Sequence, residues 1–246
     1  VAPAEGEPLP PGWQWLYFNP TARRSELGVD GHPARGGFLP PVALPRRMWA
    51  GSRINYLADL PVGEVAEKTS EILSVKNKQG KSGALCFVTV RHSISCHAID
   101  CIVEEQDIVY REAVAPSSAA PPKPKQYEAT AEWSEAFQPD TPLLFRYSAL
   151  TFNGHRIHYD KPYACNEEGY PDLVVQGPLT ATLLQKFARE CVEGHALSSF
   201  TFRGVSPLFV GRAFTLEANR EDANTLNVWV RGPDGELSMS ATAIIR

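Results

Sequence analysis

The chain has 246 residues, 43% of them hydrophobic and 21% charged, and a formal net charge of -4. This composition supports a folded core and excludes a disordered protein, and the length allows one large domain or two of ordinary size. No basic stripe could follow a phosphate backbone, no apolar run could span a membrane, and no signal-like segment opens the chain. We therefore expect a cytoplasmic protein without nucleic-acid or membrane partners.

The cysteines give no sign of a disulfide framework or a metal centre. The chain has five, an odd number, and they are scattered rather than densely paired, so reduced thiols are expected. His92, Cys96, His97 and Cys101 lie in or beside a run of alternating apolar residues and lack the two matched pairs of a structural zinc site. We expect no metal and no redox cofactor.

The first half of the chain carries one helical candidate followed by segments typical of strands. Residues 45–56, introduced by a Gly- and Pro-rich stretch, are expected to form a helix. The sequence LPVG at residues 60–63 then opens three segments that are rich in β-branched residues and separated by short turns. These expected strands are residues 65–76, 84–94 and 98–110.

A Pro-rich linker is expected at residues 115–126. Its sequence, beginning APSSAAPPKPK, favours an extended and solvated backbone. The linker divides the chain into an N-terminal domain, residues 1–114, and a C-terminal domain, residues 127–246, each near the usual domain size.

The second half repeats the order of the first. Residues 178–193 are the stronger helix prediction, with Pro at the first position, a broad apolar face and Gly194 just past the end. The sequence LFVG at residues 208–211 then matches LPVG, and it opens further expected strands at residues 213–219, 225–230 and 237–245. An apolar helix followed by an antiparallel sheet is buried if the sheet wraps around it, so we predict an α+β fold with two helix-in-sheet rolls.

Polar side chains crowd residues 147–164, with the sequence YSALTFNGHRIHYDKPYA, and form no periodic face. Asn153 and His158 lie five positions apart there, with His155 between them. The apolar residues interleaved with them argue against a simple solvated loop, so this stretch is the first candidate for a chemical site.

This stretch resembles the hydratase motif of MaoC-like and R-specific enoyl-CoA hydratases, in which an Asp and a His lie five residues apart in the pattern YxxLSGDxNPIH. The positions in register are Tyr147, Leu150, Ile157, His158 and Ala164. Asn153 stands where the family has its catalytic Asp, and His155-Arg156 stand where it has Asn-Pro.

Together with GGFLPPVALPRRMWAG at residues 36–51, this form of the motif is similar to one branch of the family. That branch contains 3-methylfumaryl-CoA and itaconyl-CoA hydratases and the mitochondrial hydroxyacyl-thioester dehydratase. The resemblance implies a double hotdog fold and a hydro-lyase whose partner is an acyl-CoA thioester.

The replacement of Asp by Asn153 makes His158 the one titratable group of the pair, because an amide can only donate or accept hydrogen bonds. An imidazole with an ordinary pKa of about 6.5 suits proton transfer near neutral pH. We assign His158 as general acid and base and Asn153 as the residue that holds the attacking water. Tyr147 and His155 are expected to contact the substrate.

Attack at the β carbon of an enoyl thioester moves negative charge onto the thioester oxygen, so the site needs a donor there. Gly177 stands at the start of the predicted helix, where free N–H groups favour an anion, whereas Pro178 has no N–H to give. The resemblance gives a helix-start glycine the same task. We expect the Gly177 N–H to polarise the thioester carbonyl and Gln176 to contact the substrate.

The first half has no matching His and Asn pair, and the resemblance implies that it has lost catalysis and shapes the pocket. Arg46 and Arg47 are candidates to bind the free carboxylate of a dicarboxylyl group, because burying that charge without a partner is costly. The expected reaction is hydration of itaconyl-CoA or 3-methylfumaryl-CoA to citramalyl-CoA, as in itaconate degradation.

Two alternatives are left open by the sequence. One is a 3-hydroxyacyl-thioester dehydratase of fatty acid synthesis, acting on acyl carrier protein or longer acyl-CoA esters, and the other is a noncatalytic acyl-CoA binding module. Since two rolls in one chain supply the pair that single rolls obtain by dimerising, we expect a monomer or a homodimer.

Overall fold

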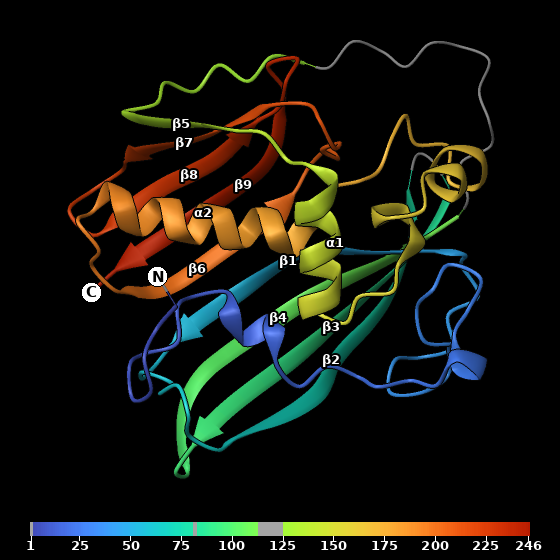
Figure 1. Ribbon diagram of the computed structural model, residues 1–246, viewed down its shortest axis with the longest axis horizontal. Coiled ribbons are helices and arrows are strands. Elements are labelled where there is room, and N and C mark those ends of the chain that lie inside the picture. The colour runs from blue at the N-terminus through green and yellow to red at the C-terminus, as the bar shows by residue number, and fades with distance from the viewer. Residues whose placement is uncertain (1, 81–82, 113–124) are drawn as a thin grey trace.

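One antiparallel sheet runs through the molecule (Figure 1). The structure, a computed structural model, describes residues 2–80, 83–112 and 125–246, and the strands of these residues pair in the order β2-β3-β4-β1-β6-β9-β8-β7-β5. The strands are β1 (Arg46–Tyr56), β2 (Ala66–Gly80), β3 (Gly83–Cys96), β4 (Ile99–Arg111), β5 (Trp133–Phe137), β6 (Leu197–Gly204), β7 (Phe214–Arg220), β8 (Thr225–Arg231) and β9 (Leu237–Ile245). The helices are α1 (Thr141–Leu150) and α2 (Gly177–Cys191).

The two halves of the sheet have the same topology. The order β2-β3-β4-β1 in the first half is repeated as β7-β8-β9-β6 in the second, and the halves join where β1 pairs with β6. The six strands expected from alternation and turn residues are all present, and the internal repeat is confirmed at the level of topology. Of the expected linker, only residues 125 and 126 lie within the described part of the chain.

The helix expected at residues 45–56 is wrong, because this segment is strand β1. Its buried side chains, Ser52, Ile54 and Tyr56, follow every second position, which is the period of a strand. β1 is the counterpart of β6, and its central place in the sheet explains why tertiary pairing overrides the weak helical pattern. The described part of the first half contains two 3-10 turns, Trp13–Leu16 and Arg24–Glu26, and no α-helix.

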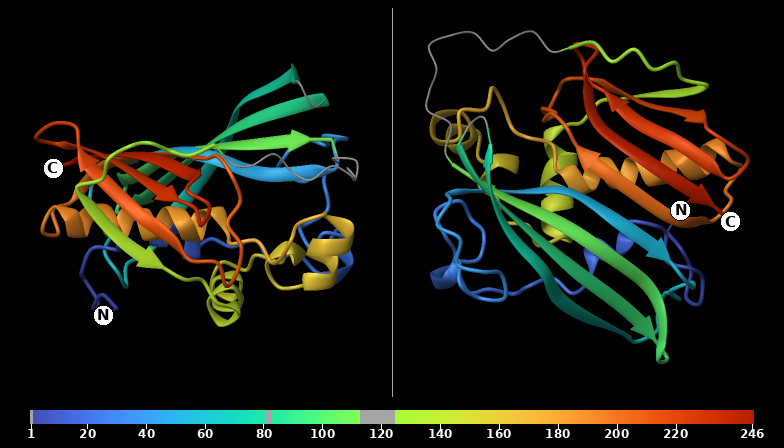
Figure 2. Two further views of the ribbon diagram at one scale, coloured as in Figure 1. Left: turned by 90° about the horizontal axis from the view of Figure 1, so that it is seen from above. Right: turned by 180° about the vertical axis from the view of Figure 1, so that it is seen from behind.

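Helix α2 is the centre of the second half, as predicted. It packs on β6, β7, β8 and β9, and its buried face includes Leu184, Phe187 and Ala188. Helix α1, which the sequence analysis did not predict, is capped by Asp140, whose side chain accepts a 2.8 Å hydrogen bond from the Leu143 N–H. Both helices lie on the same face of the sheet (Figure 2).

In the first half, residues 13–45 lie on that same face of the sheet, and we call them the N-terminal arm (Figure 2). Leu39, Val42 and Leu44 of the arm pack against a small apolar cluster on β3 and β4. Irregular chain cannot fill the space under four strands as an α-helix does, and this leaves room for a cavity. None of the helices in the described residues has the length and apolar character needed to cross a membrane.

Candidate active site

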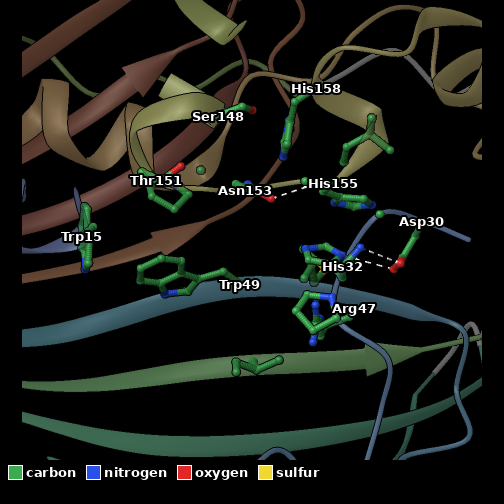
Figure 3. A pocket seen from close by; sticks show the side chains of 18 of the residues that line it. Trp15, Asp30, His32, Arg47, Trp49, Ser148, Thr151, Asn153, His155 and His158 are labelled. Atoms are coloured by element: carbon green, nitrogen blue, oxygen red, sulfur yellow. Dashed lines mark hydrogen bonds and ion pairs between the residues drawn. The ribbon is translucent and has the colours of Figure 1, made fainter. Parts of the chain in front are cut away.

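A cavity of about 1350 Å³ lies between the N-terminal arm, the inner face of the first-half strands, the loop after α1 and the start of α2. Figure 3 shows part of its wall. Of the sequence-predicted site residues, the structure brings Arg46, Arg47, Tyr147, Asn153, His155, His158 and Gly177 to this cavity. Residues that are far apart in the sequence therefore line the same cavity.

His158 is held in the tautomer that a general base needs. Its ring Nδ1 lies 2.7 Å from the Val174 backbone oxygen, which can only accept, so Nδ1 carries the proton and Nε2 keeps a lone pair. The side chain is buried on the 3-10 turn Arg156–His158, and burial lowers its pKa to about 4. At neutral pH the imidazole is therefore uncharged and able to accept a proton.

Asn153 is oriented by its own loop. Its Oδ1 accepts a 3.1 Å hydrogen bond from the His155 backbone N–H, which leaves the Nδ2 group as the donor that can face the cavity. Figure 3 shows His158 directed toward the segment that carries Asn153 and His155. An amide donor beside an imidazole acceptor is an arrangement that can hold one water molecule.

Gly177 begins α2, and its N–H has no acceptor within the helix. A Cβ built on Gly177 would meet nothing within 4 Å, so this residue is open to the cavity. The positive end of the α2 dipole and an N–H without a partner in the helix thus lie at the wall of the cavity.

Gln176 lies elsewhere than expected, because the structure does not bring its side chain to the cavity. It is fully buried, and its Nε2 donates to the Leu144 backbone oxygen at 2.9 Å and to Ser148 Oγ at 3.0 Å. Gln176 therefore ties α1 to the start of α2 and positions Gly177. Tyr147, also on α1, does line the cavity, and burial raises the pKa of its hydroxyl, which stays protonated.

The two candidate arginines differ in what they contact. Arg46 forms an ion pair with Glu168 and donates a 2.9 Å hydrogen bond to the Glu167 backbone oxygen. Arg47 lies next to His32 in the cavity (Figure 3), and it forms no ion pair with any residue that the structure describes. The geometry therefore favours Arg47 over Arg46 as the group that can bind an anion.

The sequence analysis missed two functional candidates on the N-terminal arm, Asp30 and His32. His32 Nδ1 lies 3.2 Å from Asp30 Oδ2, and the His32 ring packs on the His155 ring at a centroid distance of 4.2 Å. The centroid of the His155 ring in turn lies 5.5 Å from the centroid of the His158 ring. The only local signal was an Asp two positions before a His, a spacing that permits an Asx turn.

Four histidines of this chain have lowered pKa values, and burial is the main cause for each. The pKa falls to about 4 for His92 and His158 and to about 2 for His155, and it is also lowered for His32. An unfolded chain would bind protons at these positions near pH 6.5, whereas the folded chain does not. Burying these neutral imidazoles therefore costs no stability above pH 6.5. Stability is lost as the pH falls from 6.5 toward the pKa values of the folded state, because protons then bind the unfolded chain preferentially.

We therefore expect the free energy of unfolding to fall between pH 7 and pH 5.5, by about 1 kcal/mol for each of His92, His155 and His158. Urea unfolding followed by circular dichroism at several pH values measures this slope. The His92→Gln variant removes one such group and should show a shallower decline. A stability that is constant or rises on acidification over this interval would contradict the burial argument.

Comparison with known proteins then decides the family. The model of the family described as hydroxyacyl-thioester dehydratase type 2 matches residues 12–210. The chain belongs to the hydroxyacyl-thioester dehydratase type 2 family. It is 49% identical over 243 residues to the mesaconyl-C(4)-CoA hydratase of Chloroflexus aurantiacus, covering 98% of this chain and 85% of that protein. It is 28% identical to the mitochondrial hydroxyacyl-thioester dehydratase type 2 of Schizosaccharomyces pombe, covering 90% and 80% of the two chains.

Solved structures support the fold. A MaoC-like dehydratase from Phytophthora capsici has a TM-score of 0.66 at 13% identity, covering 85% of this chain and 76% of that one. A Mycobacterium tuberculosis protein described as having a double hotdog fold has a TM-score of 0.61 at 14% identity, covering 97% and 82%. The double hotdog prediction and the MaoC-like resemblance are thus confirmed, and so is the expectation that this family member is a hydro-lyase.

Proposed function

We propose that this hydro-lyase hydrates short, branched dicarboxylyl-CoA thioesters and forms citramalyl-CoA from 3-methylfumaryl-CoA and itaconyl-CoA. The observation that carries the proposal is one cavity that contains a neutral His158 with its Nε2 available, the open Gly177 N–H and the cation Arg47. The relative at 49% identity, named for mesaconyl-C(4)-CoA, which is another name for 3-methylfumaryl-CoA, supports it.

In the proposed mechanism, His158 Nε2 takes a proton from a water molecule held by Asn153, and the water oxygen bonds to the β carbon. The double-bond electrons move toward the thioester oxygen, where the Gly177 N–H and the α2 dipole stabilise the enolate. The protonated His158 then gives its proton to the α carbon, and the alcohol is complete. His158 acts once as a base and once as an acid, whereas Asn153 and Gly177 only form hydrogen bonds, so the step balances without an oxidant or reductant.

Arg47 is the proposed partner of the substrate's free carboxylate. Such a carboxylate loses hydration when it enters the cavity, and a guanidinium with planar, paired donors replaces that hydration better than an ammonium does. Arg46 is a weaker candidate because Glu168 already neutralises it.

The wall of the cavity on the first-half strands is mixed in character. Lys68, His92 and Gln106 line it together with Trp49, Ile94 and Ile108, and His92 lies 3.2 Å from Gln106 Oε1 and 2.8 Å from Ser70 Oγ. An apolar wall also suits an alkyl chain. The dehydratase of fatty acid synthesis is therefore the second candidate, carried by the family match.

We expect the Arg47→Met variant to lose about 100-fold in kcat/KM for 3-methylfumaryl-CoA, the size of effect that an unpaired carboxylate in a partly buried site gives. The loss for crotonyl-CoA, which has no free carboxylate, should be much smaller. Steady-state rates from the loss of enoyl absorbance measure both, and Arg46→Met is the matched control. Equal losses from the two arginine variants would contradict the assignment of Arg47.

A panel of enoyl-CoA esters tests the function as a whole. Incubation with 3-methylfumaryl-, itaconyl-, crotonyl- and long-chain enoyl-CoA, followed by mass spectrometry, should show addition of one water to the diacid esters first. Hydration of long-chain esters alone would support the fatty-acid dehydratase, and binding without any hydration would support an acyl-CoA binding module. Because one chain already contains both halves of the double hotdog sheet, we also propose that it acts as a monomer or a homodimer.

A further inference from the structure

Across the cavity from His158, the N-terminal arm presents a second imidazole, and this one is paired with a carboxylate. Asp30 Oδ2 lies 3.2 Å from His32 Nδ1, and Asp30 Oδ1 accepts a 3.0 Å hydrogen bond from the His32 backbone N–H. Although burial raises the pKa of Asp30, its hydrogen bonds with His32 keep that pKa below its usual value, so the carboxylate stays charged and can only accept. His32 therefore carries its ring proton on Nδ1 and keeps a lone pair on Nε2.

The position of this pair is built into the fold. Gly31, with φ of +86°, lies so close to Gly154 that a Cβ at Gly31 would collide with the Gly154 carbonyl oxygen. Arg156 donates from its backbone N–H to the Asp30 backbone oxygen at 2.9 Å and from Nη1 to the Val29 oxygen at 3.0 Å. These contacts dock the arm on the loop that carries Asn153 and His158.

The surroundings of His32 are those of a base and not of a surface ion pair. Its side chain is 21% exposed, lines the cavity and packs against His155, with Arg47 beside it. Burial is the largest cause that lowers the pKa of His32, and the nearby Arg47 lowers it further, so the imidazole is neutral near pH 7. Figure 3 shows His32 and His158 extending from different segments of the wall, with His155 between them.

The two substrates of the proposed function differ in where the double bond lies. In 3-methylfumaryl-CoA it is conjugated with the thioester, and water adds at the β carbon through an enolate. In itaconyl-CoA the double bond points outward to a terminal methylene and is not conjugated with the thioester. The outward double bond must first move into conjugation, and this migration needs a base at the α carbon, whereas hydration needs a base at the water.

We propose that His32, held by Asp30, is a second proton-transfer base that moves the double bond of an exomethylene acyl thioester into conjugation before His158 adds water. The inference rests on the proposed function, and it departs from the expectation that the first half only shapes the pocket. It assigns the N-terminal arm a chemical step.

The step balances without any oxidant or reductant. His32 Nε2 removes a proton from the carbon between the thioester and the branch point, and the C–H electrons form a dienolate whose oxygen is held by the Gly177 N–H. The protonated imidazole, stabilised by Asp30, then returns a proton to the terminal methylene carbon. That carbon becomes a methyl group, the new double bond is conjugated, and the composition of the thioester is unchanged.

The first test uses the full-length protein with both esters. The His32→Gln variant should lose about 100-fold or more in kcat/KM for itaconyl-CoA but less than about fivefold for 3-methylfumaryl-CoA. His92→Gln, which removes another partly buried imidazole of the cavity wall, is the matched control and should not change the ratio of the two rates. Equal losses with both esters for His32→Gln, or no loss with either, would overturn the proposal.

A second test looks for isomerisation in a variant that cannot hydrate. The His158→Ala variant cannot hydrate, but it should still convert itaconyl-CoA to the conjugated isomer, seen as a rise in enoyl absorbance, and the double variant His32→Gln/His158→Ala should not. No rise with His158→Ala would overturn the inference. If the wild-type protein hydrates neither ester, the proposed function itself fails, whereas hydration of 3-methylfumaryl-CoA alone overturns only the role of His32.

A metal ion is the alternative occupant of this cluster. Ligand atoms of Asp30, His32 and His155 lie within 4.8 Å of one another, close enough to hold a divalent cation. The proposal predicts that dialysis against EDTA leaves the itaconyl-CoA rate unchanged. Loss of that rate on dialysis, with recovery on adding Zn²⁺, would assign the cluster to a metal and overturn the proton-transfer role.

Discussion

The His158→Ala variant is expected to hydrate 3-methylfumaryl-CoA about 1,000-fold more slowly than the wild-type protein. The reason is that the Asn153 amide does not titrate near neutral pH, so the pair has no second acid or base that can replace His158. Hydration is followed by the loss of enoyl absorbance, and binding of a saturated thioester by calorimetry should be largely preserved.

Two controls make this result specific. His195, an exposed histidine just after α2, should be replaceable by alanine without effect. Thermal unfolding of His158→Ala shows whether the lost contact to the Val174 backbone oxygen has loosened the loop. Turnover near the wild-type rate in a folded His158→Ala protein would end the assignment of His158 as the acid and base.

The Gly177→Pro variant is expected to lower kcat by about 100-fold to 1,000-fold, the effect of removing one donor to a developing oxyanion. Proline removes the N–H and adds a ring that fixes φ, and it is tolerated in the first turn of a helix, where that N–H has no internal partner. The preceding residue, Gln176, already has the φ of -63° and ψ of 130° that a following proline requires. The backbone can therefore keep its course while the donor is lost.

Gly177→Ala is the matched control, because it adds one carbon in open space and keeps the N–H. A stopped-flow measurement that separates binding from chemistry should show that the proline variant loses rate and keeps most of its affinity for the thioester. Equal rates for the proline and alanine variants would mean that the oxyanion is bound elsewhere.

The contrast between α2 and β1 explains which elements were predictable. Helix α2 has a proline at its start, a glycine after its end and an apolar stripe between them, so local signals and tertiary packing agree. β1 contains Arg46, Arg47 and Met48 ahead of a glycine, which gives no clear alternation at its start. Its strand conformation comes from pairing with β4 on one side and β6 on the other, and those partners are distant in the chain.

The residues of the candidate site also differ in whether the sequence could predict them. Asn153, His155 and His158 were found together because they lie in one short stretch that matches a family motif, and Gly177 because it begins a recognisable helix. Gln176 was expected at the substrate, but its side chain turns inward to Leu144 and Ser148, and nothing local in the sequence indicates this. His32 was missed because more than a hundred residues separate it from the histidine on which it packs.

The amino-acid sequence by itself therefore determined the family motif, the repeated order of strands and the central helix α2, and it singled out His158 as the proposed acid and base, since each of these depends on residues that are neighbours in the chain. Only the tertiary structure decided that Arg46 is neutralised by Glu168 while Arg47 faces the cavity, and that an Asp and a His from the N-terminal arm lie beside the hydratase loop. The physical reason is that a pocket is formed by side chains from distant segments, and their distances are set by how sheet, helix and arm pack together.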